Sequence, residues 1–287
     1  RKGELSDQSR TYWRYFLAQI ERKPADPHDL RWYELKKMIQ AEGWGYHTIR
    51  KLEGVTEPYI SFERNHHGAP HPPRETWNEL ALRNVVNLDV RLLDRHGDTL
   101  AIPPDQLRGV VGVIRRNLVN CSTLMAEIGK RWWGSPTLHP TGERGETFYG
   151  RDVQHYLWFK SLFDSLIDVN ESAAKLEFSQ WNSSDPIFFG KLCIYYASNT
   201  RICNSREGFG LIQQLPGDVF WDRESQRELL FSLRTMWPRL SRAQRRRIEL
   251  RIVNGPEKWS DEEGSEFKVR RASYAASRLR WLELNGC

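Results

Sequence analysis

The chain has 287 residues, of which 39% are hydrophobic and 12% aromatic, and its formal net charge at pH 7 is +6. The aromatic content excludes an intrinsically disordered chain, and no apolar run reaches the length of about 18 residues that crosses a membrane. Because its four cysteines form no Cys-x-x-Cys pair, a zinc ribbon and a disulfide scaffold are excluded. We therefore expect reduced thiols and a cytoplasmic location.

The first part of the chain, residues 1–55, is predicted to be an N-terminal helical segment. Apolar side chains recur at helical spacing in three stretches, 11–22, 29–38 and 46–52. The next stretch, 56–74, contains several prolines, which cannot donate the hydrogen bonds of a helix. We expect it to be a proline-rich loop or linker.

Residues 75–133 are predicted to form a helical hairpin. Its first helix spans 75–94, where apolar residues lie on one broad face. Its second helix spans 105–128 and has a strong apolar stripe, with Pro104 at the start, where proline costs little. The polar, glycine-containing segment that follows, 134–150, is predicted to be a loop.

The remainder, residues 151–287, is predicted to be a C-terminal helical array. An Asp185–Pro186 pair is typical of a helix start, whereas Gly208–Phe209–Gly210 is interpreted as a turn that joins helices. Trp237–Pro238 is the predicted corner of an αα-hairpin. Further helices are predicted over 151–166, 187–196, 222–236, 241–254 and 260–284.

Every predicted element is helical, so the expected fold class is all-α. No clean 34-residue repeat is visible, but degenerate helical arrays tolerate drift in the length of their repeats. An irregular, α-solenoid-like helical array is therefore the expected architecture, and a compact helical bundle is the alternative.

Motifs of known chemistry give no candidate site. The chain contains no G-x-S-x-G, P-loop or G-x-G-x-x-G pattern, so no catalytic or cofactor-binding residue is assigned and no cofactor is expected. The triplet His66, His67 and His71 lies in the proline-rich segment without cysteine partners, and we interpret it as part of a solvated loop and not as a metal site. Cys193 and Cys203 are interpreted as buried structural thiols.

Five arginines near the predicted αα-hairpin form the strongest candidate binding surface. They are Arg239, Arg242, Arg245, Arg246 and Arg251. Side chains three or four residues apart share one face of a helix, and guanidinium groups neutralise phosphates. These residues are candidate contacts for phosphate or for an acidic partner. Pairing with Glu249, Glu228 and Glu224 on a solvated face is the simpler interpretation.

Three strings in the last hundred residues carry a resemblance to a known family. They are FFGKLCIYY, DVFWDRESQRELLFSLRTMWPRLSRAQRRRIELRIVNGPEKW and RLRWLELNGC. The matching positions are packing and turn residues, namely Phe220–Trp221, Arg227–Glu228–Leu229–Leu230, Trp237–Pro238 and Gly255–Pro256. Over residues 187–287 the chain resembles the helical C-terminal regions of large bacterial antiphage-type proteins, which carry a sirtuin-like NAD-degrading domain at the N-terminus.

The resemblance implies a sensing or scaffolding module of a larger antiphage defence protein. Such a module acts through a protein partner or self-association, and NAD hydrolysis belongs to the N-terminal domain of that family. No catalytic residue is carried over, because this chain shows no equivalent of the NAD-binding residues. The chain begins at Arg1, without a Met, and is expected to be a piece of a longer protein.

Two other functions stay open. One is a nucleic-acid-binding helical module that uses the basic helix face, and the other is a hydrolase whose site the sequence does not reveal. We expect the isolated chain not to hydrolyse NAD, because it lacks a glycine-rich turn to hold the phosphates.

Overall fold

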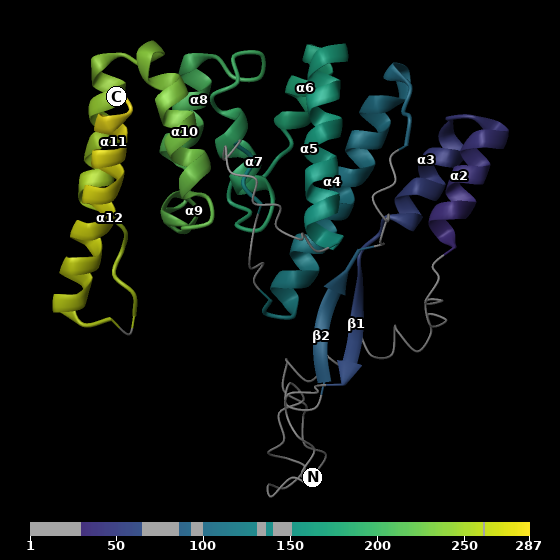
Figure 1. Cartoon of the computed structure of the whole chain (residues 1–287), viewed down its shortest axis with the longest axis horizontal. Helices are drawn as coiled ribbons and strands as arrows, with labels where there is room; N and C mark the ends of the chain where they lie inside the picture. The colour runs from purple at the N-terminus through teal and green to yellow at the C-terminus, as the bar shows by residue number, and fades with distance from the viewer. Residues whose placement is uncertain (1–29, 65–85, 93–99, 131–135, 140–150, 261) are drawn as a thin grey trace, which may run out of the picture. The chain divides into compact units, whose positions relative to one another are not determined.

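The fold is all-α, as predicted. The computed structural model describes residues 30–64, 86–92, 100–130, 136–139, 151–260 and 262–287 (Figure 1). Of these residues, 68% are helical, in 11 α-helices, and the only strands among them form one two-stranded sheet. No helix in the described ranges is both long enough and apolar enough to cross a membrane.

The chain divides into two compact units. Unit 1 consists of residues 1–132 and 149–162, and unit 2 consists of residues 133–148 and 163–287. The division falls inside helix α5 (Arg151–Val169), which contributes its first part to unit 1 and the rest to unit 2.

Unit 1 is built on the helices α2 (Arg31–Glu42), α3 (Tyr46–Val55) and α4 (Pro104–Glu127). The predicted apolar stripe of α4 is buried, and Pro104 lies in its first turn, as expected. In α2, Trp32 and Leu35 are buried, whereas Tyr33 is 56% exposed.

Unit 1 contains two β-strands at positions where the sequence predicted a loop and a helix. β1 (Tyr59–Arg64) lies inside the stretch predicted to be a proline-rich loop or linker, and β2 (Val86–Arg91) lies inside the helix predicted over 75–94. They pair in antiparallel register, with Ile60 opposite Val90. In β2, Leu88 and Val90 are buried while Asn87 is exposed, a period of two that a strand requires. The prediction failed because the apolar residues around β2 also fit a helical period.

Glu53 of α3 ties that helix to α4 through ion pairs. Its carboxylate lies 2.7 Å from Arg116 and 2.7 Å from Arg50. Burial raises the pKa of Glu53, but the hydrogen bonds and charges of Arg116 and Arg50 outweigh it and hold this pKa below its ordinary value of 4.5. The pairs are therefore fully formed at neutral pH.

We expect Glu53→Gln to lower the free energy of unfolding by less than about 1 kcal/mol at neutral pH, because the arginines are partly solvated. A carboxyl group with a depressed pKa stabilises the fold above its unfolded-state pKa, and this contribution is lost as the pH falls through its folded-state pKa. The difference between variant and parent should therefore shrink as the pH falls below 4.5 and vanish below the folded-state pKa of Glu53. Urea unfolding at a series of pH values measures it, and a pH-independent difference would contradict this account.

Unit 2 is helical, and all of its helices after residue 188 contribute to one hydrophobic cluster. The helices that follow α5 are α6 (Glu171–Phe178), α7 (Phe189–Tyr196), α8 (Ser205–Gln214), α9 (Gly217–Trp221), α10 (Gln226–Met236), the 3₁₀ helix η2 (Trp237–Arg239), α11 (Arg242–Asn254) and α12 (Gly264–Leu284). Helix α10 contacts α7, α9 and α12, and α11 packs beside α12 (Figure 1). The two helices of the predicted αα-hairpin are α10 and α11, joined at Trp237–Pro238, but α10 packs mainly on α7 and α11 mainly on α12.

Local signals set several helix boundaries of unit 2. The Asp185 carboxylate accepts hydrogen bonds from the backbone N–H groups of Ile187 and Phe189, at 2.9 and 3.2 Å, just before α7. The helix predicted over 187–196 is thus present as α7, but it begins at Phe189, and its N-cap residue is Phe188 and not Asp185. Ser241 caps α11, and its side chain accepts from the N–H of Gln244 at 3.3 Å.

Gly208 lies inside α8, so the interpretation of Gly208–Phe209–Gly210 as a turn between helices is wrong. The glycine is needed because α8 meets the end of α7 there. A Cβ at Gly208 would lie 2.2 Å from the carbonyl oxygen of Ala197. The close approach of two backbones explains a residue that the sequence pattern assigned to a turn.

A pair of glycine substitutions in α8 tests this packing. Gly208→Ala should destabilise the chain by about 1–3 kcal/mol, because the new methyl group overpacks against a backbone atom. The matched control is Gly210→Ala, where the new Cβ meets nothing within 4 Å. Its expected effect is a gain of up to about 1 kcal/mol from helix propensity. Thermal unfolding of both variants measures the contrast, and equal effects would contradict the close contact.

Some predictions lie outside the described residues. These are the helix over 11–22, the histidine triplet at 66–71 and most of the loop predicted over 134–150.

Candidate functional site

Three of the five candidate arginines donate to backbone carbonyl groups within unit 2. Arg239 donates to the carbonyl of Ser198 at 2.9 Å, and Arg245 donates to that of Leu240 at 3.1 Å. Arg251 donates to several carbonyls at the end of α8, including that of Ile212 at 2.7 Å. These guanidinium groups cap helix ends and loops, and only part of their donor capacity faces solvent.

Arg251 is the most enclosed of the three. Its guanidinium carbon lies 3.9 Å from the centre of the Phe220 ring, and burial lowers its pKa. This cation–π contact holds α11 against α9. A structural role therefore accounts for Arg251 without a ligand.

The other two candidate arginines lie on the exposed face of α11. Arg242 is exposed, and Arg246 is 67% exposed with one ion pair, at 3.4 Å, to Glu249. With Leu250 and Val253 they form one line along the helix, at spacings of four, four and three residues. We call these four residues the α11 stripe. It is basic at the start of the helix and apolar at its end.

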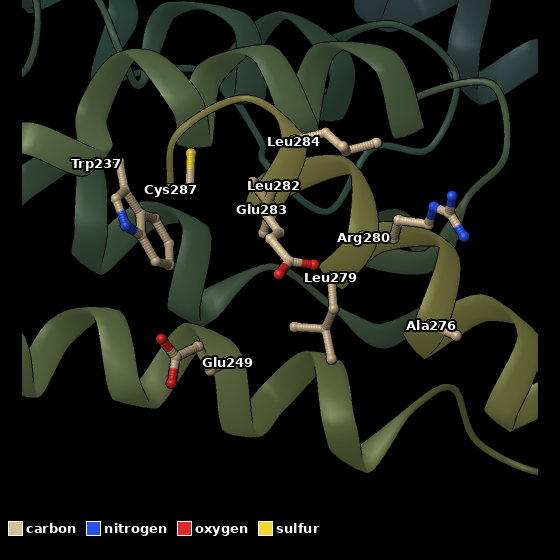
Figure 2. A pocket seen from close by; sticks show the side chains of 9 residues that line it. All are labelled: Trp237, Glu249, Ala276, Leu279, Arg280, Leu282, Glu283, Leu284 and Cys287. Carbon is tan, nitrogen blue, oxygen red and sulfur yellow. The ribbon is translucent and has the colours of Figure 1, made fainter.

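Beside the stripe, α11 and α12 enclose a groove of about 720 Å³ (Figure 2). Its walls come from η2, α11, α12 and the end of the chain. They consist of Trp237, Glu249, Ala276, Leu279, Arg280, Leu282, Glu283, Leu284 and Cys287. We call this site the α11–α12 groove.

The groove combines an apolar floor with two carboxylates. Trp237 and Leu282 are buried at its base. The carboxylates of Glu249 and Glu283 extend into the space between the helices, Leu279 lies next to Glu283, and Arg280 points away (Figure 2). Glu283 makes no ion pair within the described part of the chain. A groove of this kind accepts an apolar side chain that lies next to a basic one.

Unit 2 also contains a buried charge pair outside the groove. Glu228 is 0% exposed, and Lys191 is 3% exposed, with 3.6 Å between their charged atoms. The second carboxylate oxygen of Glu228 accepts from the backbone N–H of Leu138 at 2.7 Å. Desolvation lowers the pKa of Lys191 in spite of the opposing charge of Glu228. Glu228 is therefore not on a solvated face, and the proposed pairing with the arginines is wrong for this residue.

Arg278 of α12 is a second buried charge that sequence reasoning missed. It is 1% exposed, donates to the carbonyl of Phe220 at 2.8 Å and lies 4.1 Å from the centre of the Trp221 ring. Burial lowers its pKa to about 10. Helical spacing could have predicted its burial, because Arg278 falls between Ala275 and Leu282 on the buried face of α12. Its contacts fix α12 against α9.

Thiols and metal ligands give no second site in the described ranges. Cys193 and Cys203 are buried, as expected, and burial raises the pKa of both thiols, to about 11 for Cys203. No group of three or more His, Cys, Asp or Glu residues in those ranges is arranged to hold a metal ion. We therefore take the α11–α12 groove as the candidate site of unit 2.

Comparison of the chain with protein-family models, curated proteins and solved structures found no match.

Proposed function

We propose that this chain is a helical sensing or scaffolding module of a larger bacterial antiphage defence protein, and that it binds a protein segment in the α11–α12 groove. The observation that carries the binding role is the groove itself, with two carboxylates over a floor that contains Trp237 and Leu282. Its ligand is a segment with an apolar side chain for the floor and a lysine or arginine for the carboxylates. Burial of the apolar group supplies affinity, and the charges select the sequence.

The link to defence proteins rests on the sequence resemblance. Residues 187–287, which resemble the C-terminal regions of antiphage-type proteins, fall entirely within unit 2. They include every residue that lines the groove. The same segment therefore carries the resemblance and the candidate binding site.

A protein ligand fits this surface better than nucleic acid. Arg239, Arg245 and Arg251 already donate to backbone carbonyls. The groove carries two carboxylates, which repel phosphate groups. The alternative of a nucleic-acid-binding module therefore has only the exposed arginines of α11 in its favour.

Synthetic helical peptides with a fluorescent label test the proposed function. One peptide carries leucine anchors with lysines one turn away, and its matched partner carries glutamates in place of the lysines. We expect anisotropy to show that the full chain binds the lysine peptide at least about tenfold more tightly, because like charges oppose the glutamate peptide. Duplex DNA serves as the third probe.

Two substitutions of alanine on α12 locate the binding. Ala276 lines the groove and is exposed, so Ala276→Trp should fill the space and abolish binding of the lysine peptide. Ala272→Trp, one turn earlier at an exposed position outside the groove, is the control and should leave binding unchanged. Equal binding by both variants, or binding of DNA alone, would overturn the proposal.

A further inference from the structure

The α11 stripe and the α11–α12 groove have complementary chemistry. The stripe presents exposed arginines and the apolar side chains of Leu250 and Val253, which are 43% and 49% exposed. The groove presents two carboxylates over an apolar floor. Each surface has the charge that the other needs, and each has apolar groups left open to solvent.

We propose that the segment bound in the groove is the α11 stripe of a second copy of this chain, so that two copies associate about a two-fold axis. This inference rests on the proposed function and names its partner. With two-fold symmetry the stripe of each copy enters the groove of the other, and the contact is made twice.

Symmetry matters because one contact alone is small. With 13 residues, α11 is about 20 Å long. A single helix on a groove covers much less than the roughly 1,600 Å² of a standard interface, whereas two such contacts come closer to it. The result is a weak, reversible dimer.

Free charges on both surfaces favour this partner. In the described part of the chain Arg242 makes no ion pair, and neither does Glu283. The net charge of +6 opposes contact between two copies in general. An attraction between copies therefore depends on local pairing of this kind, which salt weakens.

Charge reversal tests the proposal with a built-in rescue. The first variant reverses the groove, with Glu249→Lys and Glu283→Lys. The second reverses the stripe, with Arg242→Glu and Arg246→Glu. Sedimentation equilibrium from low micromolar to several hundred micromolar chain gives the dimer dissociation constant of the parent, of each variant and of their equimolar mixture. Thermal melting confirms that each variant is folded.

We expect the parent to dimerise and each variant alone to dimerise about a hundredfold more weakly, because like charges then meet at both contacts. The mixture should recover the dimer, since each reversed groove meets a reversed stripe. A parent that stays monomeric, variants that dimerise as the parent does, or a mixture that fails to recover would each overturn the inference. If the lysine peptide still binds the groove in those cases, the proposed function stands and only this partner is wrong. If neither the dimer nor binding of the lysine peptide is observed, both the inference and the proposed function are overturned.

Discussion

Trp237→Ala should cost about 3–5 kcal/mol of unfolding free energy, because truncation of a buried tryptophan removes its transfer free energy and leaves a cavity. Trp237 is 6% exposed and belongs to the hydrophobic cluster of unit 2 with Leu233 and Leu240. It lies at the corner between α10 and α11, so its ring fixes how these two helices meet. The loss is a large part of the roughly 5–15 kcal/mol that holds a domain together.

Two controls separate packing from surface effects in that experiment. Trp259→Ala makes the same substitution at a side chain that is 58% exposed, and Arg246→Ala removes an exposed charge. We expect the first to cost about 1 kcal/mol or less, mainly through its stacking with Arg270, and the second less than about 0.5 kcal/mol. If Trp237→Ala melts like the parent while Arg246→Ala unfolds, the assignment of Trp237 to the buried face and of Arg246 to the exposed face is wrong.

Glu228→Gln should cost a similar amount, about 3–5 kcal/mol, because it removes the carboxylate that faces the buried ammonium group of Lys191. The amide oxygen still accepts from the N–H of Leu138, so the charge is the main loss. Chemical unfolding measures the effect. Lys191→Met in the Glu228→Gln background should recover part of the stability, because no buried charge remains.

The pH dependence of this variant gives a second readout. The pKa of Lys191 lies below its ordinary value of 10.5, because of burial. For a base with a depressed folded-state pKa, the penalty of charge burial is present at low pH and is relieved as the pH rises through that pKa. The deficit of Glu228→Gln should therefore shrink at alkaline pH, and a deficit that grows there would contradict the buried-pair account.

Local signals explain which helices the sequence predicted correctly. The helix over 105–128 has a long apolar stripe and a proline at its start, and α11 has Ser241 as its cap and Gly255 at its end. These features act within a few residues of each other. The strand β2 was not predicted, because its short apolar run fits both a helical and a strand period. Its partner β1 also lies more than twenty residues away in the chain.

The candidate site was predictable only in part. The sequence placed the arginines on one helix, but it did not show which of them donate to carbonyls of distant segments, as Arg251 does to the end of α8. The buried positions of Glu228 and Arg278 also depend on partners from other helices. The groove between α11 and α12 depends on the distance between these two helices, which the hydrophobic periodicity of the sequence does not predict.

Photo-crosslinking tests the central claim, that this module binds protein through the α11–α12 groove, most directly. The lysine peptide would carry a photoreactive group at its apolar anchor, and mass spectrometry would locate the crosslinks on the full chain. The account predicts crosslinks at groove residues such as Leu279, Glu283 and Trp237, and their loss in Ala276→Trp. Crosslinks confined to unit 1, or spread over the chain and unchanged in Ala276→Trp, would contradict it.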